Sequence, residues 1–161
     1  GAYEAAIRHY ARVERQNPAF LPEALGPLAE CYRELGRDTD LREYLERLVA
    51  EHRGVTPLLM LTELLGEIGG VAVARQRIVE ELEQRPTVRG IDRLIDYAYA
   101  AAEGPARADF ALLKEVTARL LERRHNYVCG KCGFKGRSLH WLCPSCKTWN
   151  TVKPLHGIEG E

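Results

Sequence analysis

The sequence predicts an all-α superhelix of antiparallel helix pairs that carries a small metal-binding β module at its C-terminal end. Two observations predict this class: glycines that end helical stretches recur at a nearly constant spacing, and four cysteines cluster near the end of the chain. The 161 residues, 45% hydrophobic and 29% charged, suit a soluble helical array with one appended module. Because no apolar run approaches about 18 residues, we expect no membrane span.

The helical part has an internal period. Gly36, Gly69 and Gly104 each end a helical stretch and lie 33 and 35 residues apart, while Pro18 and Pro86 lie 68 apart. A period of about 34 is that of tetratricopeptide repeats, in which glycine ends the first helix of each pair and proline stops the second. The match is degenerate, so an irregular helical bundle with coincidental spacing is the alternative.

The apolar periodicity defines the individual helices of the first predicted domain, residues 1–124. Ala74, Ile78 and Leu82, for example, recur every four residues while charged side chains occupy the opposite face. The first helix has the pattern of a second helix without its partner, and we therefore expect further repeats in front of it. The predicted helices span 2–16, 22–35, 38–52, 56–68, 70–85, 88–102 and 106–124.

Stacked repeats form a concave surface, which usually binds peptides, helices or another domain. The first helix of each pair supplies its floor, and the sequence predicts four charged side chains there: Glu23, Glu30, Arg33 and Glu63. A merely solvated face is the alternative for each of them. Cys31 lies among them in sequence, and we expect it to be a small buried residue rather than a reactive thiol.

Four cysteines, Cys129, Cys132, Cys143 and Cys146, follow the spacing Cys-x2-Cys-x10-Cys-x2-Cys. Each two-residue spacer lets the backbone reverse, so that two thiolates face one ion at about 2.3 Å, and two such knuckles complete a tetrahedron. We therefore predict a tetrathiolate metal site in a second domain, residues 125–161. Because protein fills all four positions, the site should be structural rather than catalytic.

Neighbouring residues refine this prediction. Gly133 supplies the positive φ that a knuckle usually needs, whereas Lys147 stands where the second glycine is expected. His140 lies between the knuckles, and we expect it to support a ligand or face solvent rather than bind the metal. Disulfides and a redox dithiol are the alternatives, but the chain shows neither a signal peptide nor a βαβ unit.

The formal net charge of zero hides a separation of charge. Residues 123–158 contain seven basic and no acidic side chains, whereas residues 1–122 contain 16 basic and 21 acidic ones. Since a divalent ion on four thiolates adds −2, a module of about +5 faces a body of about −5. We expect the module to dock on its own helices through the apolar anchors Trp141, Trp149 and Leu155, because no flexible linker precedes it.

The stretches "GPARADFALLKEVTARLLERRHNYVCGKCGF" and "LHWLCPSCKTWNTVKPLHG" resemble the C-terminal half of the bacterial lipopolysaccharide assembly protein B family. The resemblance is most specific over residues 104–157, where the two knuckles, the His-Trp and the Thr-Val-Lys-Pro fall in order. It implies tetratricopeptide repeats joined to a rubredoxin-like metal domain of the zinc-ribbon kind, with the four cysteines as ligands. Zinc is favoured for a structural role, and iron suits four thiolates equally well.

The resemblance also implies a function. Family members are adaptors without catalytic activity, held to the cytoplasmic face of the inner membrane by an N-terminal helix that these 161 residues lack. The implied partners are the membrane-anchored protease FtsH, the lipid A deacetylase LpxC whose proteolysis they promote, and lipopolysaccharide assembly proteins. The residues agree, since no Ser-His-Asp grouping, phosphate-binding loop or zinc-protease motif is visible.

Two other functions fit parts of the sequence. A nucleic-acid binder would use the basic residues together with Tyr127, Phe134, Trp141 and Trp149 for stacking. A small module needs its few aromatic residues for its own core, however, which makes nucleic acid the weaker interpretation. Electron transfer by iron is the third, although the x10 connection permits only a reduced version of a rubredoxin.

Overall fold

The computed structural model describes residues 1–52, 54–122 and 125–155. Within these ranges the chain forms seven α-helices, one 3-10 turn and a three-stranded sheet. The helical elements are α1 (Ala2–Gln16), η1 (Pro18–Phe20), α2 (Leu21–Glu34), α3 (Asp38–Glu51), α4 (Val55–Gly69), α5 (Val71–Gln84), α6 (Val88–Ala101) and α7 (Gly104–Glu122). Each α-helix agrees with its predicted range to within two residues; positions 123 and 124 of the last prediction lie outside the described residues.

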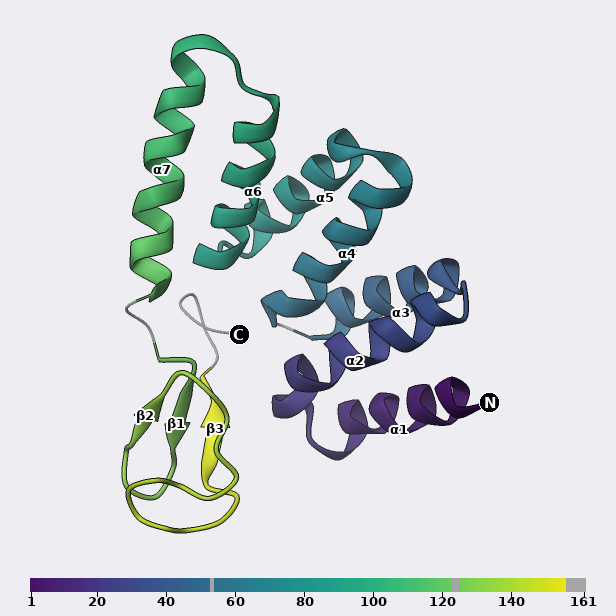
Figure 1. Cartoon of the computed structure of the whole chain (residues 1–161), viewed down its shortest axis with the longest axis vertical. Helices are drawn as coiled ribbons and strands as arrows, with labels where there is room; N and C mark the ends of the chain where they lie inside the picture. The colour runs from purple at the N-terminus through teal and green to yellow at the C-terminus, as the bar shows by residue number, and fades with distance from the viewer. Residues whose placement is uncertain (53, 123–124, 156–161) are drawn as a thin grey trace.

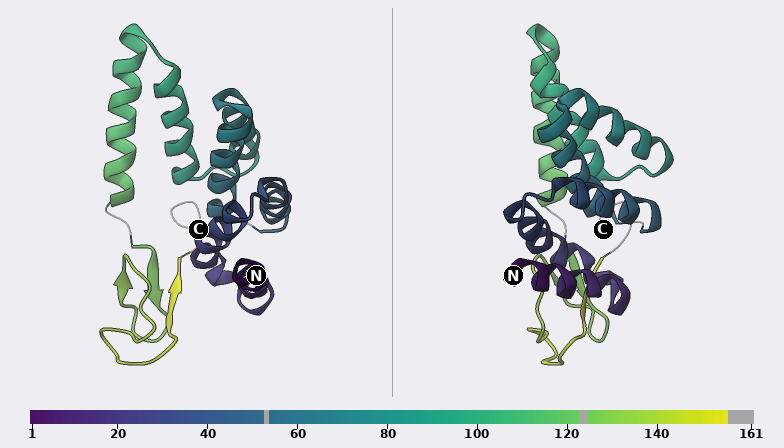
Figure 2. Two further views of the ribbon diagram at one scale, coloured as in Figure 1. Left: turned by 45° about the vertical axis from the view of Figure 1, so that its right-hand side comes forward. Right: turned by 90° about the vertical axis from the view of Figure 1, so that its right-hand side faces the viewer.

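Successive helices pack against one another along the chain, and α4 also contacts α2 and α6. The first helices of the pairs (α2, α4 and α6) therefore form one layer, and the second helices form the other. Figures 1 and 2 show this stack turning progressively along its length. The arrangement is the predicted tetratricopeptide-like superhelix. Among the described residues, no helix has the length and hydropathy needed to cross a bilayer.

Glycines in the left-handed region mark the turns between helices. Gly36 follows α2 with φ +64°, and Gly104 has φ +58° at the start of α7. After α4 the positive φ of +86° falls on Gly70 rather than on Gly69, which is the last residue of that helix. Gly69 ends α4, as the sequence predicted, whereas Gly104 is the first residue of α7 and does not end α6. A side chain would be strained at each of the three positive-φ positions.

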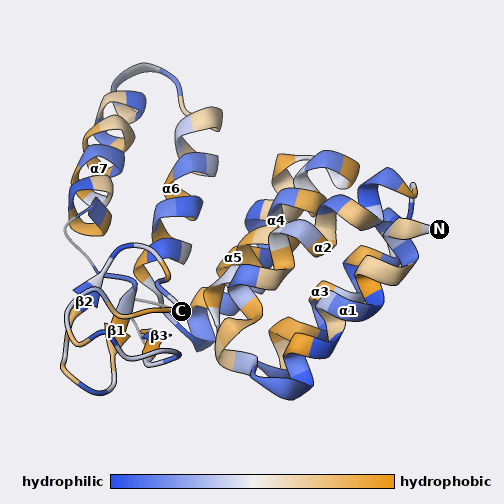
Figure 3. Cartoon of the chain, turned by 60° about the horizontal axis from the view of Figure 1, so that its bottom comes forward, coloured by the Kyte–Doolittle hydropathy of each residue, from blue (hydrophilic) through white to orange (hydrophobic). Residues whose placement is uncertain are grey.

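The helices enclose one continuous apolar core, and Figure 3 shows orange and blue alternating along each helix as amphipathic packing requires. Leu25, Leu45, Leu61 and Ile78 are fully buried at its centre. Cys31 belongs to the same core and is 8% exposed, so the expectation of a buried residue is confirmed.

The C-terminal module, here called the ribbon (residues 125–155), is a small antiparallel sheet with the order β2-β1-β3. Its strands are β1 (Tyr127–Cys129), β2 (Lys135–Gly136) and β3 (Val152–Pro154). The registers pair Tyr127 with both Gly136 and Pro154. Buried Cys129, Cys143 and Val152 form its interior, so sulfur atoms supply much of a core that is otherwise very small.

Candidate metal centre

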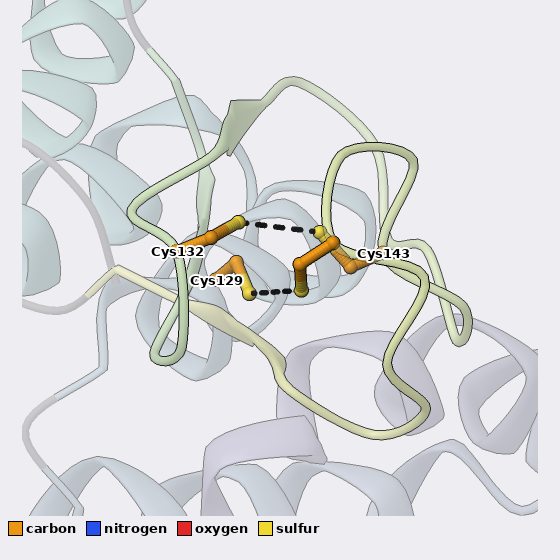
Figure 4. Close-up of side chains that lie close together, drawn as sticks. Cys129, Cys132 and Cys143 are labelled. Atoms are coloured by element: carbon orange, nitrogen blue, oxygen red, sulfur yellow. Dashed lines mark hydrogen bonds between the residues drawn. The ribbon is translucent and has the colours of Figure 1, made fainter.

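The four predicted cysteines come together at the knuckle end of the ribbon. One ligand atom from each, the Sγ, lies within 4.8 Å of the other three. Cys129 Sγ is 3.8 Å from Cys146 Sγ, and Cys132 Sγ is 3.7 Å from Cys143 Sγ (Figure 4). A tetrahedron with metal–sulfur bonds of about 2.3 Å has edges of about 3.8 Å, so these separations fit one ion held by four thiolates.

Both knuckles have the same backbone turn. Gly133 N–H donates to Cys129 O at 2.9 Å in the first, and Lys147 N–H donates to Cys143 O at 3.0 Å in the second. Gly133 has φ +75°, as predicted, and Lys147 has φ +53°. Lys147 thus adopts the left-handed conformation that the missing glycine would have supplied. Such a conformation costs a non-glycine residue about 1 kcal/mol or more, which the paired knuckle geometry must offset.

The four thiols differ in their surroundings. Cys129 and Cys143 are buried, whereas Cys132 is exposed, so one corner of the tetrahedron faces solvent. Burial raises the pKa of the Cys143 thiol to about 11. Because a metal ligand must be a thiolate, metal binding has to displace this proton, and occupancy is therefore linked to pH.

Two threonine hydroxyls stabilise thiolates on opposite knuckles. Thr151 Oγ1 lies 3.2 Å from Cys129 Sγ, and the hydrogen bond between them lowers the pKa of Cys129 to about 6. Thr148 Oγ1 lies 3.5 Å from Cys146 Sγ and lowers the pKa of that thiol in the same way. Neither threonine was singled out from the sequence. Thr151 and Thr148 lie one and four residues before β3. The sequence does not show that this strand passes close to the cysteine sulfurs, so it gave no reason to select them.

His140 is not part of the sulfur cluster. Its Nε2 lies 3.3 Å from Ser138 Oγ, and its ring meets the edge of Phe134 at a centroid distance of 6.1 Å. It thus supports the loop between the knuckles.

A second group of ligand-type side chains, Glu14, Glu51 and His52, is also close together. Arg47 lies among them, with Nη1 2.6 Å from Glu14 Oε1 and 2.8 Å from Glu51 Oε2. The guanidinium already neutralises these carboxylates, so the cluster is an ion-pair network.

The four side chains predicted for the concave floor are all exposed. Arg33 Nη2 lies 3.4 Å from Glu67 Oε2 on the next first-layer helix. Glu23 instead accepts a hydrogen bond from the Tyr127 hydroxyl of the ribbon. Glu30 and Glu63 remain exposed on α2 and α4, and their role as partner-binding residues stays a prediction.

The ribbon contacts the helices near η1, a segment that the sequence analysis left between two helices. Trp141 stacks on Phe20 with ring centroids 5.4 Å apart, and Lys153 Nζ lies 4.7 Å from the centre of the same phenyl ring. Among the described contacts, none places the other two predicted anchors against the helices, and for Leu155 the anchor role stays a prediction. Trp149 is 69% exposed, and the Leu155 N–H donates to a backbone carbonyl within the ribbon.

Five of the seven predicted basic residues lie in the described ribbon: Lys131, Lys135, Arg137, Lys147 and Lys153. Arg123 and Arg124 lie outside the described residues.

Comparison with known proteins agrees with this architecture. Residues 127–154 match a family model described as the rubredoxin metal binding domain. The chain is 34% identical over 161 residues to lipopolysaccharide assembly protein B of Escherichia coli (strain K12), and the same values hold for that of Escherichia coli O157:H7. It is 29% identical over 160 residues to lipopolysaccharide assembly protein B of Haemophilus influenzae.

These alignments cover 99% of the chain but only 40–41% of each relative, so the chain spans well under half of their length. The boundary between its helical and metal-binding parts falls between Glu122 and Tyr127, and the predicted division into 1–124 and 125–161 stays a prediction. Along nearly its whole length, the chain is similar to part of lipopolysaccharide assembly protein B, and its C-terminal segment matches the rubredoxin metal binding domain.

Proposed function

We propose that this chain is the non-catalytic scaffold of an adaptor that regulates lipopolysaccharide synthesis. The observation that carries the proposal is the pairing of a helical-repeat array with a four-thiolate site, in a chain similar over 99% of its length to proteins named for lipopolysaccharide assembly. Four thiolates around one ion leave no coordination position for substrate. The site therefore suits a structural role, and the repeats suit binding of other proteins.

The metal in this proposal maintains the shape of the ribbon. Cys129, Cys132, Cys143 and Cys146 would hold one ion, and zinc is favoured because a structural site needs no redox change. Iron is the alternative, since the sulfur geometry serves both ions. The ion contributes folding free energy, and the protein supplies the thiolates and the hydroxyls beside them.

The proposed partners are the protease FtsH and the lipid A deacetylase LpxC. An adaptor would act by holding the deacetylase near the protease, on the cytoplasmic side of the inner membrane, with attachment through an N-terminal segment outside these 161 residues. The charged side chains of the first-layer helices, Glu30 and Glu63 together with Arg33, are the proposed contact surface. Glu23 belongs to the ribbon contact as well.

Replacement of all four site cysteines by serine in the longer, membrane-attached protein tests the adaptor role. Because the ribbon would lose its shape, we expect the deacetylase to persist longer after protein synthesis is blocked. The amount of lipopolysaccharide should rise as a result. Cys31→Ala is the matched control, since it removes the fifth cysteine from the helical core. Unchanged deacetylase turnover in the serine variant, with normal turnover in the control, would rule out a regulatory role for the ribbon.

The double variant Glu30→Lys and Glu63→Lys tests the proposed surface separately. We expect it to weaken capture of a protein partner while metal content stays unchanged. A gel-shift assay of the unmutated chain with RNA and DNA, repeated at several salt concentrations, tests the nucleic-acid alternative. Tight binding of RNA or DNA, together with unaltered deacetylase turnover in the cysteine-to-serine variant, would favour nucleic-acid binding.

A further inference from the structure

The ribbon holds an apolar pair on its surface. Leu142 and Trp149 face each other in an isolated antiparallel bridge, and backbone hydrogen bonds of 3.1 Å and 2.7 Å flank the pair. A pair of this non-hydrogen-bonded type brings its two side chains together on one face of the ladder. Leu142 is nevertheless 40% exposed and Trp149 is 69% exposed. The knuckle therefore presents a leucine and an indole side by side to solvent.

Two ammonium groups donate hydrogen bonds to the chain neighbours of Trp149. Lys131 Nζ donates to Thr148 Oγ1 at 2.9 Å, and Lys153 Nζ donates to Asn150 Oδ1 at 3.4 Å. These acceptors are the two residues that flank Trp149 in the chain. Lys153 Nζ also lies over the Phe20 ring at the contact with the helices, so Lys131 is the lysine that a hydrogen bond holds beside the exposed Trp149 segment.

The ribbon as a whole is cationic. Its described residues include five basic and no acidic side chains, so an ion on four thiolates leaves a net charge of about +3. The loops between β2 and β3 also form one end of the molecule along its longest axis (Figures 1 and 2). A broad surface can therefore approach the loops from this end.

We propose that the face formed by Leu142, Trp149 and Lys131 binds the surface of an anionic phospholipid bilayer. An indole has an apolar ring and a polar N–H, which suits the boundary between headgroups and acyl chains. Leucine enters the apolar side of that boundary, while lysines attract the anionic headgroups. This site does not depend on the proposed adaptor function.

Nucleic acid is the other polyanion that the charge would attract. Single strands bind through successive stacked bases, and the neighbour of the indole in this pair is Leu142, which offers neither a stacking face nor a hydrogen bond. The apolar partner therefore favours the bilayer.

The chain contains two tryptophans, so Trp141→Phe leaves Trp149 as the only indole reporter. With metal-loaded protein, we expect Trp149 emission to shift to the blue on vesicles of phosphatidylcholine with phosphatidylglycerol, and brominated lipid to quench it. Trp149→Phe is the matched variant, whose remaining Trp141 stacks on Phe20 and should respond much less. Added salt should weaken the response, because exposed charges are screened.

Charge variants locate the site on the ribbon. Lys131→Gln should weaken vesicle binding about fivefold, whereas Lys135→Gln on β2 should have a smaller effect. Metal content of each variant checks that the knuckles remain formed. The proposal is overturned if anionic vesicles do not shift Trp149 emission, or if neutral phosphatidylcholine vesicles shift it equally. It is also overturned if Lys135→Gln weakens vesicle binding as much as Lys131→Gln does. An oligonucleotide that shifts Trp149 when vesicles do not would assign the face to nucleic acid.

Discussion

Arg47 on α3 forms a two-point ion pair with Glu14 on α1, one repeat earlier in the chain. Its Nη1 lies 2.6 Å from Glu14 Oε1, and its Nη2 lies 3.0 Å from Oε2. The Glu14 side chain is only 12% exposed and also accepts a hydrogen bond from the Tyr44 hydroxyl at 3.2 Å. Bidentate, charge-assisted contacts of this kind are stronger than ordinary surface ion pairs. The contact links the second helices of neighbouring repeats.

Acid should therefore weaken the array through Glu14. The Arg47 guanidinium holds the pKa of Glu14 at about 2, below its usual 4.5. Because the folded pKa lies below the unfolded one, the carboxylate stabilises the fold at neutral pH, and this contribution is lost as the pH falls from about 5 to about 2. We expect Glu14→Gln to lower the free energy of unfolding by about 1–3 kcal/mol at neutral pH and to flatten its decline in acid.

Urea denaturation across this pH range measures both effects. Glu46→Gln is the matched control, because Glu46 forms an exposed pair with Arg42 at 3.5 Å and should change stability by less than about 0.5 kcal/mol. A constant difference between wild type and Glu14→Gln down to the lowest pH would contradict the assignment.

Gly90 is needed for a close approach between α5 and α6. A Cβ at this position would lie 2.8 Å from both Leu82 Cδ2 and Thr87 Oγ1, and the Gly90 N–H donates to that same hydroxyl at the start of α6. Gly90→Ala should therefore destabilise the protein by about 1–3 kcal/mol. Gly26 lies within α2, and a Cβ at this position would meet no atom within 4 Å. Gly26→Ala should therefore be neutral or stabilise the protein by up to about 1 kcal/mol. If both variants changed the midpoint temperature of thermal unfolding by the same amount, the steric explanation would be excluded.

The helices were predictable from sequence because their signals are local and repeated. Periodic apolar residues and the glycine spacing defined each α-helix to within two residues. Gly69 ends α4 as its spacing predicted, whereas Gly104 begins α7, because a glycine between two helices marks the turn without showing which helix it belongs to. The spacing of the four cysteines likewise predicted their approach, because each knuckle is a short local turn.

The place where the ribbon contacts the helices could not be predicted in the same way. Phe20 lies in η1, a short turn with no periodic pattern, and its contact with Trp141 joins positions more than a hundred residues apart. Charge separation predicted an attraction without a location. The sequence could not tell whether Trp141 or Trp149 is the docked residue, and only the structure shows Trp141 on Phe20 and Trp149 exposed.

Removal of the metal should unfold the ribbon while the helices remain. The ribbon's buried interior is little more than Cys129, Cys143 and Val152, which is too small to fold alone. A structural zinc contributes roughly 10–16 kcal/mol of apparent binding free energy to such modules. We expect a chelator, or Cys146→Ser, to expose residues after about 127 to protease while far-ultraviolet circular dichroism of the helices is preserved. Equal protease resistance with and without metal would exclude this dependence.

Thr151→Val should weaken metal binding without changing the ligands. The hydroxyl is 3.2 Å from Cys129 Sγ, and its loss leaves that thiolate with one hydrogen bond fewer. We expect affinity in chelator competition to fall about 10–100-fold, and Thr151→Ser to restore most of it. If valine and serine variants released metal at the same rate as wild type, the hydroxyl would have no part in holding the ion.

Loss of the Trp141 ring should free the ribbon from the helices. Trp141 stacks on Phe20 at 5.4 Å, and such pairs contribute about 0.5–1.5 kcal/mol beyond the area they bury. Trp141→Ala is preferable to a change at Phe20, because Phe20 is itself buried against the helices. NMR relaxation should then show ribbon amides tumbling faster than those of α2 to α5, while metal content stays constant. Trp149→Ala, at a 69% exposed position, is the control and should leave both parts tumbling together. If the ribbon already tumbles independently in the wild type, or stays coupled in Trp141→Ala, the stacked pair does not hold it in place.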